Sequence, residues 1–473
     1  MLGRLVLKNT IYSSSSMLIA NLTGLITIIF LARALKPELF GLYSLSLSTV
    51  AILSIFSDLG IKSATTRYIA DAMAGGNYRL AGGYLRFLLN LKLALTILVA
   101  LSLFILSDSI AELFNKPISI PLQVLSIYLV FNSLSSLLIG VANAMNDFKA
   151  DLISYTLSGV SKLFLTISLV LLGLSLFGAI LAVAISTLIA FLFISYYIIK
   201  KYRIIFVSVE EVEKGRIVRF IFFTSLISLQ TVIFANVDIV MIGYFLKAED
   251  VAYYRASFSI VSAVISLIFI PAVLMPIFVK LEDDDLARAF SRAFKYSSVL
   301  CIPSAFGLML ISENLLIFAY GEDYLPGLFA MQILCILLLS PVLGIYGSIF
   351  SGKERPELNF FPLLFSMFLN VLLNYLMIPI YGINGAAFAT VLSYVVSWIV
   401  AVYIGIREFG IYPRVGDLTK PLFSAILMFL FARNFQSMLL IIPIAIFIYS
   451  IVLFAIRGVN REDIEYIRKI GKI

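Results

Sequence analysis

Fourteen apolar stretches, each about as long as a membrane-spanning helix, follow one another along this 473-residue chain. A bilayer hydrocarbon core of about 30 Å is crossed by roughly 20 residues of helix. Because no water reaches that core, a spanning backbone must satisfy its hydrogen bonds within itself, so each stretch is predicted to be helical. The expected spans are residues 11–32, 40–63, 84–106, 119–143, 152–173, 177–199, 218–243, 252–276, 297–320, 328–350, 359–380, 384–405, 419–432 and 437–456.

The composition agrees with an all-α polytopic membrane protein and with no soluble class. Hydrophobic residues make up 61% of the chain, and the mean hydropathy is +1.05. The two cysteines, Cys301 and Cys335, both fall within expected helices. We therefore expect free thiols in the core and no disulfide framework.

Basic residues predict the topology, because Lys and Arg are retained in short cytoplasmic loops. With the N-terminus inside, 27 of the 35 Lys and Arg residues fall in cytoplasmic segments, five fall outside and three fall within helices. An even number of spans places the C-terminus inside as well, where Arg468, Lys469 and Lys472 agree with it. The predicted location is the cell membrane with both termini cytoplasmic. The net charge of +8 then indicates contact with anionic lipids, not binding of nucleic acid.

The two halves of the chain echo each other at a separation of about 206 to 211 residues. Residues 41–46 answer 252–257, and residues 178–182 answer 385–389. A repeat of six helices enters and leaves on one side, so the halves are predicted to be parallel and related by a pseudo-two-fold axis along the membrane normal. Transporters of this kind rock two bundles around a site near the midplane. The expected parts are a six-helix bundle at 1–205, a second at 206–410, and two additional transmembrane helices with a basic cytoplasmic tail at 411–473.

Charged residues within the expected spans are candidates for function, because each costs about 3 kcal/mol at a helix centre. Asp58 and Lys92 lie at similar depth and can form either a structural ion pair or part of a site. Asp238 and Arg255 match in depth near the outer face. They can form either a latch that closes that face or a static brace of a helical hairpin.

Lys162 differs from these residues, because it lies near the expected midplane with no carboxylate at equal depth. Ser154, Ser158 and Thr166 share its stripe of the helix, which predicts a wet cavity and a site for an anion. The alternative is a lysine bonded to neighbouring carbonyl groups. Polar residues that can continue the lining, or else bond neighbouring helices, are Asn21, Thr27, Ser158, Gln230 and Asn236.

Signatures of catalysis are missing from the sequence. It has no histidine, no glycine-rich phosphate loop ending in Gly-Lys-Ser/Thr, and no Cys/His spacing for a metal. We therefore expect no enzyme, no catalytic residues, no metal site and no cofactor. Transport would run downhill or on a gradient of Na⁺ or H⁺.

Five strings of residues carry a family resemblance. Residues 30–43, Phe-Leu-Ala-Arg-Ala-Leu-Lys-Pro-Glu-Leu-Phe-Gly-Leu-Tyr, resemble the junction of helices 1 and 2 in the polysaccharide-type flippases. These flippases are the Wzx-like branch of the multidrug/oligosaccharidyl-lipid/polysaccharide (MOP) exporter superfamily. The other strings similar to that family are residues 58–61 with 67–70, 238–243, 321–324 and 373–387.

The resemblance implies a flippase that carries a polyprenyl-diphosphate- or dolichyl-phosphate-linked oligosaccharide from the cytoplasmic to the outer leaflet by alternating access, for cell-surface polysaccharide or glycan synthesis. Lys162 would contact the anionic head group, with Arg255 and Lys92 as secondary contacts. Asp58 and Asp238 would be their gating or ion-pair partners. The expected protein is a monomer, and glycosyltransferases or a polymerase of the same pathway stay open as partners.

Two other functions remain open at this point. A drug exporter of the multidrug and toxic compound extrusion (MATE) type would favour acidic cavity residues, whereas Lys92, Lys162 and Arg255 outnumber Asp58 and Asp238. A scaffold of a glycan-assembly complex that transports nothing would tolerate loss of every buried charge. Relatives that flip the peptidoglycan precursor carry several arginines in their first helices, where this sequence has mainly lysines, so that role is disfavoured.

Overall fold

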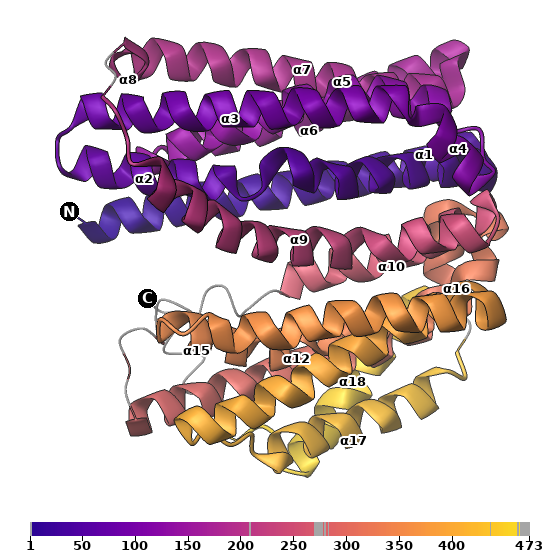
Figure 1. The fold of residues 1–473 in the computed structure, drawn as a ribbon. Helices are drawn as coiled ribbons and strands as arrows, with labels where there is room; N and C mark the ends of the chain where they lie inside the picture. The colour runs from indigo at the N-terminus through magenta and orange to yellow at the C-terminus, as the bar shows by residue number, and fades with distance from the viewer. Residues whose placement is uncertain are drawn as a thin grey trace. The chain divides into compact units, whose positions relative to one another are not determined.

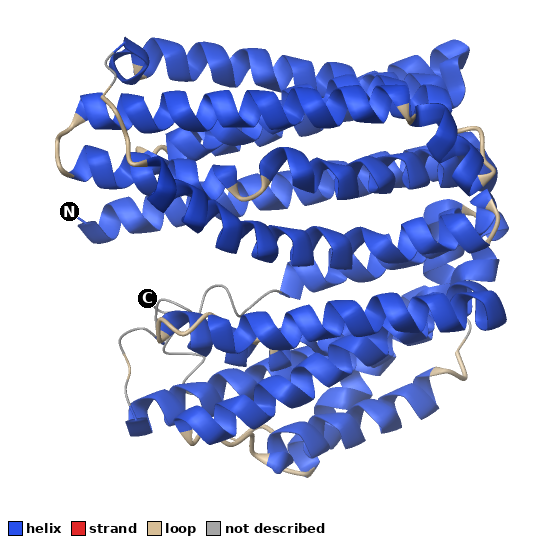
Figure 2. Cartoon of the chain, in the orientation of Figure 1, coloured by secondary structure: helices blue, strands red, loops and turns tan. Residues whose placement is uncertain are grey.

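The computed structural model describes residues 2–207, 210–268, 278, 281, 283–435, 437–460 and 463, and within these ranges it contains helices and no strand (Figure 2). This confirms the expected all-α class. The helices are α1 Leu2–Asp58, α2 Ile61–Ala74, α3 Tyr78–Ile105, α4 Ser107–Phe114, α5 Ser119–Ala144, α6 Phe148–Leu169, η1 Val170–Leu174, α7 Ser175–Lys201, α8 Arg203–Val207, α9 Lys214–Phe245, α10 Ala248–Ile268, α12 Asp283–Tyr320, η2 Glu322–Gly327, α13 Leu328–Leu334, η3 Cys335–Leu339, α14 Ser340–Leu343, α15 Ile345–Gly352, α16 Glu357–Phe409, α17 Val415–Ala432 and α18 Met438–Ala455 (Figure 1).

The chain forms two compact units, Met1–Ala256 and Ser257–Ile473. The division falls within α10, so that α9 and the first turns of α10 pack with the N-terminal helices. The expected bundle boundaries at residues 205 and 410 stay a prediction. The basic tail residues Arg468, Lys469 and Lys472 lie outside the described residues.

Among the described residues, ten helices are long and apolar enough to cross a membrane. Three of them, Leu18–Ala74, Phe148–Lys201 and Glu357–Phe409, contain 57, 54 and 53 residues and are long enough to cross twice. A shorter apolar helix covers Leu440–Ala455. The protein is thus a multi-pass membrane protein, while the count of fourteen spans stays a prediction.

Two of the long helices bend sharply between two expected spans, 11–32 and 40–63 in α1 and 359–380 and 384–405 in α16. In α1 the bend lies at Lys36 (φ 60°), directly before Pro37. Proline disfavours the helical conformation of the residue before it, so the chain turns there without unwinding a loop. In α16 the bend lies at Gly382 (φ 60°), and a Cβ on Gly385 would lie 2.3 Å from the carbonyl oxygen of Met377. Only glycine permits that close return of the backbone.

Large apolar side chains cover the outside of both units. Leu171, Leu172, Phe318 and Ile380 each expose more than 70% of their surface. Such exposure is unfavourable in water and is expected where lipid tails, which are as apolar as leucine, are the solvent.

The core of the N-terminal unit joins α2, α3, α5, α7 and α9. Tyr68 lies at its centre, with its ring 5.2 Å from the ring of Tyr84 on α3 and 5.7 Å from that of Phe220 on α9. Its hydroxyl donates a hydrogen bond to the Arg216 carbonyl (3.1 Å). These contacts fix the first half of α9 against α2 and α3.

One carboxylate joins the connections at one end of this unit. Asp147, between α5 and α6, accepts hydrogen bonds from the Lys201 ammonium (2.6 Å) and from the hydroxyls of Tyr197 (2.9 Å) and Tyr202 (3.0 Å). Burial by itself raises the pKa of Asp147, but these hydrogen bonds outweigh it, so the pKa lies below its usual value. The ionised carboxylate therefore stabilises the packing of α7 and α8 on the start of α6.

Asp147→Asn should destabilise the unit by about 1–3 kcal/mol, because three donors lose a charged acceptor. Since the folded pKa is depressed, this contribution is present above the unfolded pKa of about 3.9 and is lost as pH falls through the lower folded pKa. Thermal unfolding of purified protein at pH 7 measures the effect. Asp285→Asn is the control, because its pair with Arg288 is exposed and little change is expected.

The C-terminal unit packs α12 against α15 and against α17 and α18. Phe290 on α12 contacts Tyr346 on α15, with ring centroids 4.8 Å apart, and the Tyr449 hydroxyl on α18 donates to the Val299 carbonyl (2.8 Å). Cys301 and Cys335 are buried free thiols, as expected. A wholly buried polar network lies within α16, where Asn374 donates to Asn370 (3.2 Å) and Asn370 to Thr390 (3.3 Å).

Candidate functional site

A polar cavity of about 300 Å³ lies within the N-terminal unit. It is enclosed by both parts of α1 on either side of the Lys36 bend and by single residues of α5, α6, α9 and α10. Its lining residues are Gly24, Thr27, Ile28, Phe40, Tyr43, Ser44, Leu47, Ser48, Ala51, Tyr128, Lys162, Asn236 and Arg255.

The longest wall of the cavity is one face of α1 after the bend. Phe40, Ser44, Leu47 and Ala51 follow each other at intervals of three or four residues, which places them on one side of a helix. Tyr43 lies beside them and is 5% exposed. The sharp bend at Lys36 turns this face back toward Thr27 on the first part of α1, so a single element supplies two walls.

Two cations and no carboxylate line the cavity: Lys162 comes from α6 and Arg255 from α10. Among the described residues, the Lys162 ammonium forms no hydrogen bond and no ion pair, and the expected alternative of a lysine bonded to carbonyls is not seen there. Like charges that share a small cavity repel one another, and the repulsion grows as water is excluded. An anion that enters this cavity relieves that repulsion, whereas a cation adds to it.

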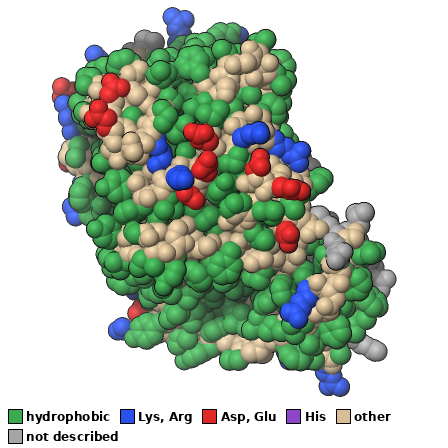
Figure 3. Space-filling view, turned by 90° about the vertical axis from the view of Figure 1, so that its right-hand side faces the viewer, with side chains coloured by type: hydrophobic (Ala, Val, Ile, Leu, Met, Phe, Trp, Pro, Cys, Tyr) green, Lys and Arg blue, Asp and Glu red, His purple; other side chains and the backbone are tan. Residues whose placement is uncertain are grey.

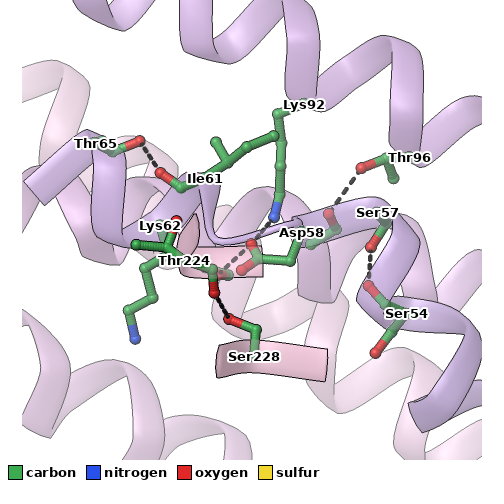
Figure 4. A network of polar contacts seen from close by, with 12 residues as sticks. Ser54, Ser57, Asp58, Ile61, Lys62, Thr65, Lys92, Thr96, Thr224 and Ser228 are labelled. Atoms are coloured by element: carbon green, nitrogen blue, oxygen red, sulfur yellow. Dashed lines mark hydrogen bonds and ion pairs between the residues drawn. The ribbon is translucent and has the colours of Figure 1, made fainter. Parts of the chain in front are cut away.

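Lys92 lies away from the cavity, fully buried on α3, and forms an ion pair with Asp58 at the end of α1. Figure 4 shows Lys92 pointing at Asp58, while the neighbouring Lys62 points away from the pair. Ser136 on α5 also donates to Asp58 (3.5 Å). The pair therefore joins three helices beside the break between α1 and α2, and the choice between a structural pair and part of a site stays open.

Asp238 on α9 accepts a hydrogen bond from the hydroxyl of Tyr254 on α10 (2.6 Å). Its expected partner, Arg255, is the next residue along α10 and lines the cavity. Both Asp238 and Tyr254 are buried, so the bond ties the two helices together inside the unit. Asp238 thus helps to hold the helix that presents Arg255.

Of the polar lining proposed from the sequence, Thr27 and Asn236 line the cavity, whereas Asn21, Ser158 and Gln230 do not. Sequence reasoning missed Tyr43 and Tyr128, which add two phenol hydroxyls to the wall. Tyr43 ends the string of residues 30–43 on which the family resemblance depends, and it belongs to the periodic face of α1. Tyr128 has no comparable signal, because it is a single tyrosine in an apolar helix.

A multi-pass helical protein with a cationic cavity among its helices has the architecture of a membrane transporter. The chain belongs to the family of polysaccharide biosynthesis proteins, whose family model matches residues 6–282. This confirms the resemblance drawn from the five strings.

Curated relatives and a solved structure extend the comparison. The chain is 25% identical over 399 residues to a probable low-salt glycan biosynthesis flippase, Agl15, of Haloferax volcanii, covering 81% of each chain. It is 26% identical over 379 residues to the lipopolysaccharide biosynthesis protein WzxC of Escherichia coli, covering 76% of this chain and 71% of that one. A structure described as the lipid II flippase MurJ in an inward closed conformation shares the fold, with a TM-score of 0.75 at 17% identity, over 94% of this chain and 98% of that one.

Proposed function

We propose that the protein moves a lipid-linked oligosaccharide from the cytoplasmic to the outer leaflet of the cell membrane, holding the phosphate of a polyprenyl or dolichyl carrier. The observation that carries the proposal is the cavity inside a membrane protein whose charged lining residues are Lys162 and Arg255, with no carboxylate among them. Membership of the polysaccharide biosynthesis family and the named flippase relatives support the same substrate class.

The chemistry of the lining suits a phosphate group. A phosphate attached to a lipid carrier keeps its charge and needs several donors when it leaves water. Lys162 and Arg255 supply charged donors, and the side chains of Asn236, Tyr43 and Tyr128 can add neutral ones. The lipid tail is uncharged and the phosphate carries the fixed negative charge of the carrier, so the phosphate is the part of the substrate that this cavity would hold.

Alternating access supplies the route across the membrane. In this proposal both termini lie in the cytoplasm, and the two halves of the chain form parallel bundles that expose the cavity to each side in turn. The bend of α1 at Lys36 and the connections of α4–α5 and α9–α10 then lie at the outer face. The distribution of Lys and Arg along the sequence supports this orientation.

The test uses purified protein in liposomes that contain a fluorescent polyprenyl-diphosphate-linked oligosaccharide. Its transfer between leaflets is followed by quenching with an impermeant reductant added outside. Faster transfer than in protein-free liposomes supports the proposal. Efflux of a cationic dye without transfer of the glycan lipid would instead indicate a MATE-type exporter, and folded protein that moves neither would indicate a scaffold.

A further inference from the structure

Lys116, in the connection between α4 and α5, reaches across to the end of α9. Its ammonium donates to the carbonyl oxygens of Gly243 (2.6 Å) and Leu246 (2.7 Å), and to that of Phe114 in its own connection (3.2 Å). The last carbonyls of a helix lack partners and carry partial negative charge. The last turn of α9 has no basic residue of its own, so the cation that caps it comes from another segment of the chain.

The turn between α9 and α10 presses on α1 beside this lysine. A Cβ on Gly41 would lie 1.8 Å from the carbonyl oxygen of Ala248, and a Cβ on Gly243 would lie 2.4 Å from Leu45. The glycines permit this close approach, but they contribute no side chain that could form a hydrogen bond or an ion pair across it. The two bonds from Lys116 to Gly243 and Leu246 are therefore a charged attachment of the turn to the α4–α5 connection.

This contact lies directly beyond the cavity. Gly41 follows Phe40, which lines the cavity, and Ala248 precedes Arg255 by seven residues, or two turns of α10. Ala248 packs against Gly41 at the same end of the unit as α4, and this contact closes the space between α1 and α10 at that end. Figure 3 looks onto that end, where acidic and basic side chains lie among apolar ones.

We propose that Lys116 is a latch that ties the α9–α10 turn to the α4–α5 connection, so that the turn stays packed on α1 and the cavity stays closed to the outer side until the bonds to the end of α9 are released. The orientation rests on the proposed function. Lys116 also lines an open depression of about 510 Å³ together with Glu38, Tyr244, Lys247 and Glu249. Water and two carboxylates are thus at hand to receive the ammonium when it leaves the carbonyls. This second set of partners makes the latch reversible.

The test follows access to the cavity with a single cysteine and needs no substrate. Ser48→Cys places a thiol in the lining after Cys301 and Cys335 have been changed to alanine. An impermeant thiol reagent is added to the medium of right-side-out membrane vesicles to label from the outer face, and to the medium of inverted vesicles to label from the cytoplasmic face. Lys116→Met should raise outer labelling about tenfold, as expected for loss of bonds from a charged donor, and should slow inner labelling.

Lys247→Met is the matched control, because this exposed lysine lines the same depression and its side chain forms no bond among the described residues. Its labelling should equal that of the parent protein. A lower melting temperature of Lys116→Met with unchanged labelling would show a merely structural cap and overturn the proposal. If the methionine variant does not fold, Lys116→Gln, which keeps a neutral donor, replaces it. We expect it to raise outer labelling by less than tenfold, and no rise in outer labelling would count against the latch. Because no glycan lipid is added and transport is not the readout, the result does not depend on whether the proposed substrate is correct.

Discussion

Lys162→Met is expected to lower the rate of glycan-lipid transfer in liposomes by about 10- to 100-fold, while the protein folds and reaches the membrane at normal levels. A hydrogen bond from a charged donor to a phosphate contributes about 1.5–3 kcal/mol, and each 1.4 kcal/mol corresponds to a factor of ten. Folding should be little affected, because the Lys162 ammonium has no partner among the described residues that the change would leave unsatisfied. Methionine has a similar length and fills a similar volume.

Lys149→Met provides the control for Lys162, since it removes an exposed lysine from the first turn of the same helix, outside the cavity. It should transfer the glycan lipid at the rate of the unchanged protein. Arg255→Met should cause a loss similar to that of Lys162→Met, and the double variant should lose less than the product of the two, because both cations serve one bound group. Unchanged transfer by Lys162→Met, with normal amounts of folded protein, would exclude the cavity as the phosphate site.

The sequence predicts the helices well, because hydrophobic length decides what can span a bilayer. It predicts the connections poorly. Residues 33–39 contain charges and Pro37, which indicate a loop, yet the structure forms a bend at Lys36 and continues as helix on both sides. The same holds at Gly382 in α16. Whether a proline and its neighbours make a loop or a bend depends on how the flanking helices pack, and one sequence does not contain that information.

The depth of a residue along a membrane helix can be counted from the sequence. The side of the helix on which its partner lies cannot be assigned until the neighbouring helices are known. Counting residues from the helix ends placed Asp58 and Lys92 at equal depth, and the structure joins them. The same count matched Asp238 with Arg255, which stays a prediction, and it gave no sign of the hydrogen bond that Tyr254, one residue earlier, donates to Asp238. One residue rotates a helix by about 100°, so neighbouring positions share a depth and face different sides.

The cavity lining shows the same limit. Lys162 stood out because a cation without a carboxylate at its depth is costly in a membrane. Tyr128 and Ser48 carry no such cost and gave no signal. They line the cavity because α1 bends back and four other helices contribute single residues to the opposite walls. Such a site is assembled by the packing of several helices. Its charged residues can be predicted one by one from the sequence, whereas its neutral residues can be identified only from the structure.

Asp58→Asn is expected to destabilise the N-terminal unit by about 3–5 kcal/mol, the usual cost of leaving a buried charge without its partner. Lys92 is 0% exposed and loses the carboxylate that compensates its ammonium. The carboxylate also lies at the end of α1, where the helix dipole disfavours negative charge, so Lys92 stabilises Asp58 in return. Directly after it, Leu59 (φ 44°) and Gly60 (φ 75°) turn the chain into α2, and the pair holds this break against α3. Thermal unfolding in detergent measures the loss.

Replacing both Asp58 and Lys92 distinguishes a structural role of the ion pair from a role in transport. The double variant Asp58→Asn with Lys92→Met leaves no buried charge and should regain most of the stability that Asp58→Asn loses. Lys62→Met is the control, because that lysine points away from the pair, and it should unfold like the unchanged protein (Figure 4). A double variant that is stable and transfers glycan lipid at the normal rate would make the pair a brace of three helices. A stable double variant with slow transfer would show that the charges themselves take part in the conformational cycle, and equal stability of the single and double variants would show that Lys92 does not depend on Asp58 at all.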